Sequence, residues 1–224
     1  MRKFLITFLL LLMFAPFAIQ ADETANGAKD ATIGTTNLYV SPSGWAVWDY
    51  EGPEFQGDTF SFGFEDGTFM GWTNIDADGD GHNWMTISEL VSGDASEYVH
   101  GGADAAISQS YDNSLGAFNA NNWMITSAIV IPATGEYSAS WFAASLDDGY
   151  PDSYSVYIGT EPTVAGMTAN PAVISHTANA WELKSVSLAS YAGQTIYIGF
   201  NHVDSDNYVL MIDDFSVALG TAAE

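Results

Sequence analysis

The chain has 224 residues, of which 28 are acidic, four are Lys or Arg and none is Cys. The formal net charge of −24 excludes nucleic acid and anionic membranes as electrostatic partners, and the lack of Cys excludes disulfides, a thiol nucleophile and a lipid anchor on sulfur. With 47% hydrophobic residues the chain can still bury a sizeable core, which must supply most of its stability.

The first 21 residues have the pattern of a secretory signal peptide. Arg2 and Lys3 precede an apolar run at residues 4–13, and small residues follow up to Ala21. The run is too short to span a bilayer, so we expect cleavage after Ala21 and a secreted or surface-located protein without membrane insertion. The mature chain then keeps two lysines against 28 acids, a charge of −26. Divalent cations would neutralise such a surface, and a charge that only maintains solubility is the alternative.

Two short segments precede the main domain. Residues 22–34 are small and polar without periodicity, which predicts a flexible leader. Residues 35–57 contain apolar runs at 38–40 and 45–48 on either side of a Pro-Ser-Gly turn, which predicts a short strand pair. The pair resembles the start of a fibronectin type III-like repeat, so we expect a remnant of such a repeat or a linker.

From residue 58 to 218 short apolar runs alternate with turn residues, and no helical repeat is sustained. The run at 195–202 is the clearest, because Ile196, Ile198 and Phe200 fall on one face of a strand. Roughly a dozen strands at this spacing predict an all-β fold, an antiparallel sandwich. Further clear strands are expected at 136–142, 153–158, 181–188 and, as a run covered on both sides, 208–212.

The segment DADGDG places Asp76, Asp78 and Asp80 on alternate residues before a glycine. An EF-hand needs flanking helices and a glutamate at loop position twelve, which here is Ile87 between β-like flanks. The sequence therefore excludes an EF-hand. It predicts that the three carboxylates converge on one hard cation, calcium, with an acidic turn that binds nothing as the alternative.

Four further acidic residues, in three segments of the chain, are candidate calcium ligands. Glu65 closes the first strand of the domain, and Asp213 with Asp214 interrupts the last. First and last strands of a sandwich often lie side by side, so we expect Glu65 near Asp213, where buried carboxylates need a counter-ion. Asp147, in the segment LDDGYPD, is the third candidate, and a solvated turn is the alternative for each.

Four motifs in order resemble the cleaved adhesin family, also called the choice-of-anchor J domain, the haemagglutinin-adhesin module found beside gingipain proteases. They are FSFGFEDGTFMGWTNIDADGDGHNW, NNWMITSAIVIP, YSASWFAASLDDGYPDSYSVYIGT and YAGQTIYIGFNHVDSDNYVLMIDDFSV, within residues 58–219. The resemblance implies a galactose-binding-like β-jelly-roll sandwich with structural calcium, acting as a secreted or surface adhesin. It carries the family's acids onto the positions named above, with the mid-domain acid at Asp147 or Asp148, although the loop around these two residues departs from the family's pattern. Residues 220–224 form a tail without a sorting domain, so we expect a protein that is released, held by a partner or part of a longer one.

Sequence motifs for catalysis are missing, since the chain contains no G-x-S-x-G, H-E-x-x-H or E-x-D-x-E. We therefore expect a binding module rather than an enzyme, with a protein or glycan ligand on a cell surface or matrix. Tyr150 and Trp84 are the candidate ligand contacts, whereas most of the other tryptophans and His202 are expected in the core. The alternatives are a carbohydrate-active enzyme or its accessory binding module, and a structural spacer in a larger extracellular assembly.

Overall fold

The computed structural model describes residues 38–40, 46–48, 59–91 and 93–220. The expected signal peptide, the leader and most of the linker lie outside these residues. Within the linker, β1 (Leu38–Val40) pairs antiparallel with β2 (Ala46–Trp48), as the sequence predicted.

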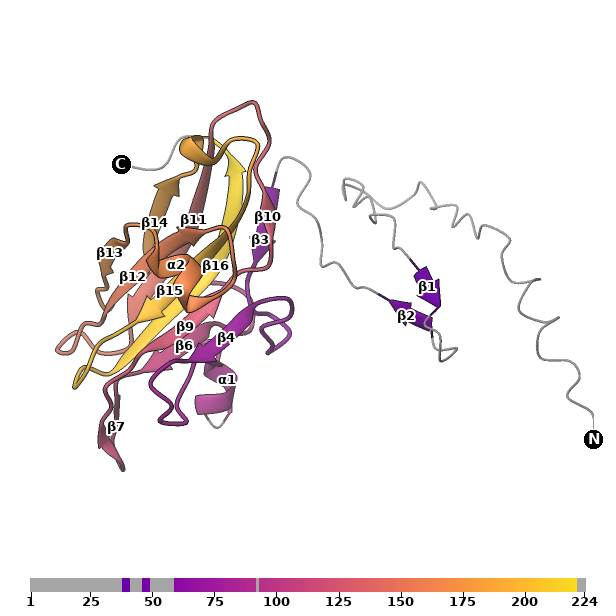
Figure 1. Ribbon diagram of the computed structural model, residues 1–224. Helices are drawn as coiled ribbons and strands as arrows, with labels where there is room; N and C mark the ends of the chain where they lie inside the picture. The colour runs from indigo at the N-terminus through magenta and orange to yellow at the C-terminus, as the bar shows by residue number, and fades with distance from the viewer. Residues whose placement is uncertain (1–37, 41–45, 49–58, 92, 221–224) are drawn as a thin grey trace, which may run out of the picture. The chain divides into compact units, whose positions relative to one another are not determined.

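The main domain is a sandwich of two six-stranded antiparallel sheets (Figure 1). The first sheet has the order β13-β12-β15-β9-β4, with β10 also paired to β15. Its strands are β4 (Thr73–Asp76), β9 (Asn122–Ile125), β10 (Ile129–Val130), β12 (Ser153–Gly159), β13 (Val173–His176) and β15 (Thr195–His202).

The second sheet has the order β14-β11-β16-β6-β5, with β3 also paired to β16. Its strands are β3 (Thr59–Phe62), β5 (Met85–Thr86), β6 (Ala106–Gln109), β11 (Tyr137–Ser145), β14 (Glu182–Ser187) and β16 (Val209–Leu219). A small hairpin of β7 (Tyr111–Asp112) and β8 (Gly116–Ala117) extends from the lower end of the sandwich in Figure 1.

The core lies between the sheets, where the alternating apolar residues of both meet. On β15 the inward residues are Ile196, Ile198 and Phe200, each completely buried, as the alternation predicted. Trp72, Phe200 and Phe215 pack with ring centroids 5.3–6.3 Å apart. Aromatic edge-to-face and stacked packing thus links strands of both sheets.

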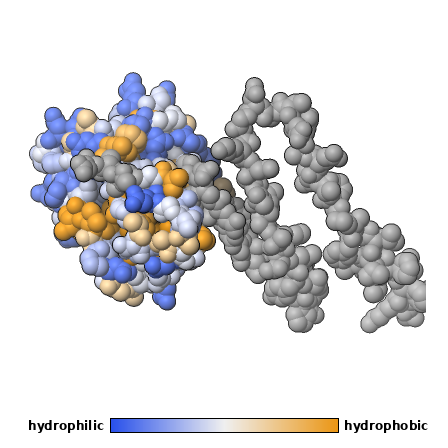
Figure 2. Space-filling view, turned by 90° about the horizontal axis from the view of Figure 1, so that it is seen from above, coloured by the Kyte–Doolittle hydropathy of each residue, from blue (hydrophilic) through white to orange (hydrophobic). Residues whose placement is uncertain are grey.

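Short helical segments cover the outer faces of the two sheets. The segment with α1 (Ile87–Leu90) packs on the second sheet, and α2 (Val164–Thr168) packs on the first. Gly199 of β15 admits α2, because a Cβ there would lie 3.2 Å from the Sδ of Met167. Figure 2, which views the molecule from above, shows a mostly hydrophilic described surface with separate hydrophobic patches.

The expected strands are all present, and two boundaries need correction. The first strand ends at Phe62, so Glu65 lies in the turn after β3 instead of closing the strand. The strand expected at 208–212 continues to Leu219, because Asp213 pairs with Phe142 and the irregularity after it, at Asp214 and Phe215, is a bulge inside β16 rather than an interruption. β3 and β16 pair directly, which confirms the expected neighbourhood of the first and last strands of the domain.

Candidate metal centres and ligand pocket

A bulge in β16 creates the first acidic cluster. Between the pairs Ser140–Ser216 and Phe142–Asp213, β16 carries one residue more than β11. Asp214 takes up this extra residue with φ 47°. Leu210 and Ile212 before the bulge and Phe215 and Val217 after it all face the core. The phase of the strand therefore shifts at the two aspartates.

The β16 cluster consists of Glu65, Asp213 and Asp214, each with a carboxylate oxygen within 4.8 Å of the others. Asp213 is completely buried, Asp214 is half-buried and Glu65 is exposed. The sequence thus correctly predicted that Glu65 and Asp213 come together.

The backbone of residues 100–103 wraps the cluster. The N–H groups of His100 and Gly101 donate to Oδ2 of Asp213 over 2.9 and 3.3 Å, and the Ala103 N–H donates to the Glu65 carboxylate. Gly102 has φ 67°, and a Cβ there would fall 1.9 Å from Oε1 of Glu65. A glycine is required at this position because both the backbone conformation and the space exclude a side chain.

The β16 cluster has an excess of negative charge. Burial raises the pKa of Asp213 to about 6, and the charge of Asp214 adds to this, although backbone N–H groups oppose it. Nδ1 of His100 lies 2.7 Å from Oδ2 of Asp214. The only Lys or Arg between residues 59 and 220 is Lys184, whose Nζ bonds Glu182. Three carboxylates in one glycine-lined cradle fit a hard divalent cation such as calcium.

The β4 loop forms the second acidic cluster, in which Asp76, Asp78 and Asp80 again place oxygens within 4.8 Å of one another. Asp76 ends β4 and accepts the N–H groups of Gly81 and Gly79 over 2.9 and 2.7 Å. The Gly81 bond is the largest cause of a lowered pKa of Asp76, whereas burial raises the pKa of Asp78. The loop thus holds one firmly ionised carboxylate beside a partly desolvated one, an oxygen set that also fits calcium.

Asp147 stands apart from both clusters. Its Oδ1 accepts the Gly149 N–H over 2.8 Å, as in a tight turn. Among the described residues, neither group of three potential metal ligands includes it.

Asp147 instead lines a pocket of about 420 Å³ at one end of the sandwich. Tyr150 is 56% exposed there, which confirms that it lies open in a loop. We call this site the tyrosine pocket; its lining is Tyr111, Asn113, Asp147, Tyr150, Asp206, Asn207 and Tyr208. Tyr111, Asp206 and Tyr208 escaped sequence interpretation because they lie far from Tyr150 along the chain.

Trp84 is not available to a ligand, contrary to the expectation from its place beside the acidic loop. It is 3% exposed and belongs to the core, where its Nε1 donates to the Asn122 carbonyl over 3.1 Å. Trp72, Trp123 and Trp141 are buried too, as expected for most of the tryptophans. The aromatic residues of the acidic loop therefore serve packing, not recognition.

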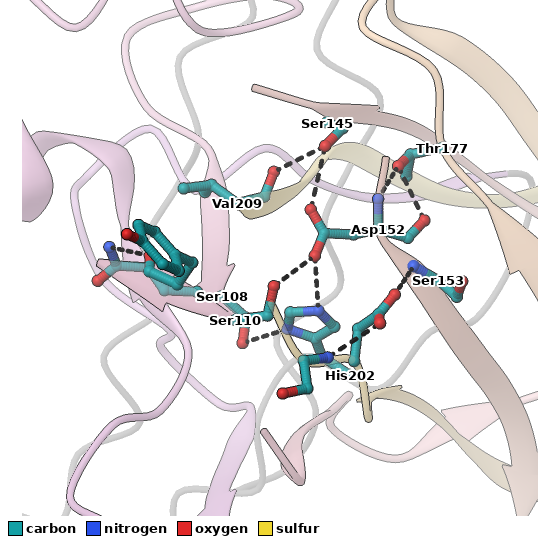
Figure 3. A network of polar contacts seen from close by, with 12 residues as sticks. Ser108, Ser110, Ser145, Asp152, Ser153, Thr177, His202 and Val209 are labelled. Carbon is teal, nitrogen blue, oxygen red and sulfur yellow. Dashed lines mark hydrogen bonds and ion pairs between the residues drawn. The ribbon is translucent and has the colours of Figure 1, made fainter. Parts of the chain in front are cut away.

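A buried polar network joins residues of both sheets (Figure 3). Nδ1 of His202 lies 2.9 Å from Oγ of Ser108, and its Nε2 lies 3.1 Å from Oδ1 of Asp152. These residue types could form a hydrolytic triad, but all three side chains are completely buried, so no substrate can reach them. The contacts of both ring nitrogens confirm His202 as a structural histidine. Sequence spacing gave no sign of Ser108 or Asp152 as its partners.

None of the helices in the described part of the chain is both long enough and apolar enough to cross a bilayer.

The sequence is similar to a known protein family and to one of its curated members. The family model named Cleaved Adhesin Domain matches residues 59–217 of this chain. Hemagglutinin A of Porphyromonas gingivalis is 26% identical over 168 residues, which cover 66% of this chain and only 6% of that protein. The chain therefore spans a small fraction of the length of this curated relative.

Solved structures show the same fold. The K1 and K3 Cleaved Adhesin domains of Lys-gingipain (Kgp) from P. gingivalis W83 match with TM-scores of 0.60 and 0.62 at 25% identity, covering 74% and 73% of this chain and 100% and 99% of theirs. TmCBM61, solved in complex with β-1,4-galactotriose, matches with a TM-score of 0.50 at 15% identity over 70% of this chain and 94% of its own. These matches confirm the expected jelly-roll sandwich.

Proposed function

The chain belongs to the Cleaved Adhesin Domain family, and on that premise we propose that it is a secreted, calcium-stabilised adhesion module. It binds a protein or glycan on a cell surface or matrix by non-covalent contacts. The family and the similarity of the fold to a carbohydrate-binding module support a binding role in general. That the protein is secreted, that it binds calcium, and that its ligand is a surface protein or glycan are proposed here.

The observation that carries the calcium proposal is the buried carboxylate of Asp213 beside Asp214 and Glu65. A buried ionised carboxylate needs a counter-charge. Lys184, the only Lys or Arg between residues 59 and 220, donates its hydrogen bond to Glu182 instead. In the proposed function Glu65, Asp213 and Asp214 hold one ion, and Asp76, Asp78 and Asp80 hold another. When bound, calcium supplies positive charge that fixes loops otherwise separated by repulsion.

Binding is favoured over turnover by where the polar groups lie. The Ser108, His202 and Asp152 side chains are buried, whereas the tyrosine pocket is open and offers aromatic rings beside carboxylates and amides. Such a lining suits non-covalent recognition.

The proposal is tested in two steps with the mature protein. Thermal unfolding is measured in EDTA and after addition of calcium, for the parent and for Asp213→Asn and Asp78→Asn, with exposed Asp148→Asn as the matched control. Calcium should raise the melting temperature by several degrees in the parent and the control, and by less in each cluster variant. An unchanged midpoint in the parent would contradict structural calcium.

Adhesion is then measured on immobilised matrix proteins, on cells and on a glycan array, each with calcium and with EDTA. Saturable binding that is weaker in EDTA supports the calcium-stabilised adhesion module. A folded, calcium-loaded protein that binds none of these surfaces would favour the structural spacer instead.

A further inference from the structure

Three loops that are far apart in sequence build the tyrosine pocket. They are the β7–β8 hairpin, the loop between β11 and β12, and the loop between β15 and β16. Figure 1 shows the hairpin and the start of β16 at the lower end of the sandwich. The volume of about 420 Å³ lies at the lower end of the range of about 300–1,000 Å³ that is usual for small-molecule sites.

The lining combines two kinds of group. Tyr150 is exposed, so its ring offers an apolar face to a ligand. Tyr111 and Tyr208 are half-buried, so their rings offer apolar faces and are held in place by the residues around them. The lining also contains carboxylates and amides, and Nδ2 of Asn113 lies 3.3 Å from the Tyr208 hydroxyl. A pyranose ring has matching chemistry, because its C–H faces pack on aromatic rings while its hydroxyls donate to carboxylates and exchange hydrogen bonds with amides.

Hydrogen bonds of the buried network, whose side chains are drawn in Figure 3, connect it to all three loops. The Ser145 hydroxyl lies 3.0 Å from both the Tyr150 carbonyl oxygen and Oδ2 of Asp152. The Ser110 hydroxyl donates to Oδ1 of Asp152 over 2.9 Å. Its backbone N–H donates to the Tyr208 carbonyl over 3.0 Å, and its carbonyl accepts from the N–H of Asp206 over 3.2 Å. A pocket held in this way requires little ordering when a ligand enters.

The charge of the pocket restricts the ligand further. Asp147 and Asp206 are part of its lining, no basic residue is, and the whole chain carries a net charge of −24. Uronic acids, sialic acids and sulphated sugars would therefore be repelled.

We propose that the tyrosine pocket binds one neutral pyranose unit at the end of a glycan. This inference rests on the proposed binding function and adds to it a location and a ligand class. Tyr150 packs on the sugar ring, and Asp147 and Asp206 accept hydrogen bonds from its hydroxyls.

The test is isothermal titration of the calcium-loaded mature protein with methyl glycosides of glucose, galactose, mannose and N-acetylglucosamine, and with glucuronic acid as the anionic comparison. At least one neutral glycoside should bind at one site with a Kd below about 1 mM. Tyr150→Ala and Asp206→Asn should each weaken that binding about tenfold or more. Val203→Ala, 53% exposed in the same loop but outside the pocket lining, is the control and should bind as the parent does.

Absence of binding to all neutral glycosides, equal binding of glucuronic acid, or unchanged affinity in Tyr150→Ala would each overturn the inference. The adhesion measurement separates this failure from failure of the proposed function. Adhesion that survives in Tyr150→Ala, without sugar binding, leaves the function standing and removes the pocket from it. Adhesion that is lost in Tyr150→Ala, yet is not inhibited by any neutral glycoside, assigns the pocket to a protein side chain and overturns the sugar class.

Discussion

The backbone conformation of Asp214 decides how the two carboxylates of the last strand are placed. In a regular strand, two consecutive carboxylates point to opposite faces of the sheet. At φ 47°, Asp214 instead shifts the phase of β16, and its carboxylate comes within 4.8 Å of those of Asp213 and Glu65. Aspartate is one of the few residues besides glycine that adopt this conformation at modest cost.

The raised pKa of Asp213 predicts a pH dependence of the metal-free protein. Its carboxyl has a pKa of about 6 in the folded state against 3.8 for the free group, so between these values the folded protein holds a proton that the unfolded chain has lost. Its stability contribution is therefore largest below pH 4 and falls by about 2 kcal/mol as pH rises from 4 to 6. Urea unfolding in EDTA should show this as a difference between the parent and Asp213→Asn.

The unfolding free energy of Asp213→Asn is subtracted from that of the parent at each pH, because other carboxylates change stability in the opposite direction. Asp76, with its lowered pKa, is one of them. If calcium binds ionised Asp213, adding calcium should abolish the fall in the parent's stability, relative to the variant, between pH 4 and 6. A parent and a variant with parallel pH profiles in EDTA would rule out the assigned shift.

Gly102 offers a second test at the same scale. Gly102→Ala introduces a Cβ against Glu65 at φ 67°, and Gly116→Ala introduces one at φ 90° with no atom within 4 Å. Both should lose about 1–2 kcal/mol from backbone strain. Only Gly102→Ala should also show a smaller calcium-induced rise in melting temperature, because it disturbs Glu65 and leaves the second cluster, at Asp76, Asp78 and Asp80, intact. Differential scanning calorimetry would measure this rise. Equal calcium responses in the two variants would show that Glu65 is not a ligand.

At the scale of elements, Asp152 ties strands of both sheets together. It lies at the start of β12, and its carboxylate contacts His202 of β15, Ser145 of β11 and Ser110 next to β6. The Thr177 hydroxyl closes the network by accepting the Asp152 N–H and donating to its carbonyl. A buried polar network of this kind specifies how the sheets align at one end, because each misplaced strand would leave a buried polar group without a partner.

Removal of the Asp152 carboxylate should therefore be costly. Asp152→Ala is expected to lose about 3–5 kcal/mol of unfolding free energy, because Nε2 of His202 and the Ser110 hydroxyl are left buried without their partner. Asp148→Ala, an exposed neighbour four positions earlier, should change it by less than about 0.5 kcal/mol. Urea denaturation compares the two, and similar midpoints would show that water replaces the carboxylate without loss.

At the scale of the whole molecule, stability is a balance between a large aromatic core and self-repulsion of the surface. Aromatic rings from both sheets pack in the core. The chain has 28 acidic but only four basic side chains. Repulsion of this size opposes the compact state and is reduced by salt or by bound cations.

The melting temperature in EDTA should consequently rise with sodium chloride between about 10 mM and 0.5 M, because the Debye length falls from about 30 to below 10 Å. Millimolar calcium at matched ionic strength should raise it further, since site binding adds to screening. Scanning calorimetry of both series checks this. Coincidence of the calcium and sodium series would mean that screening alone accounts for the effect.

The local pattern of the sequence determined the sandwich, its strands and the identity of the acidic clusters. Alternation at 195–202 and the turn chemistry around DADGDG depend on near neighbours, so they are legible without a fold. The pairing of the first and last strands followed from a general rule of sandwiches, and brought Glu65 to Asp213 as expected.

Only the tertiary structure decided which side chains meet across long stretches of chain. The bulge at Asp214 depends on the register against β11, and the burial of Trp84 depends on β9. The contacts of His202 with Ser108 and Asp152 span 94 and 50 residues. The tyrosine pocket likewise exists only where three loops meet at one end of the sandwich. Such contacts leave no periodicity in the sequence, because they are set by the packing of whole sheets and not by neighbouring residues.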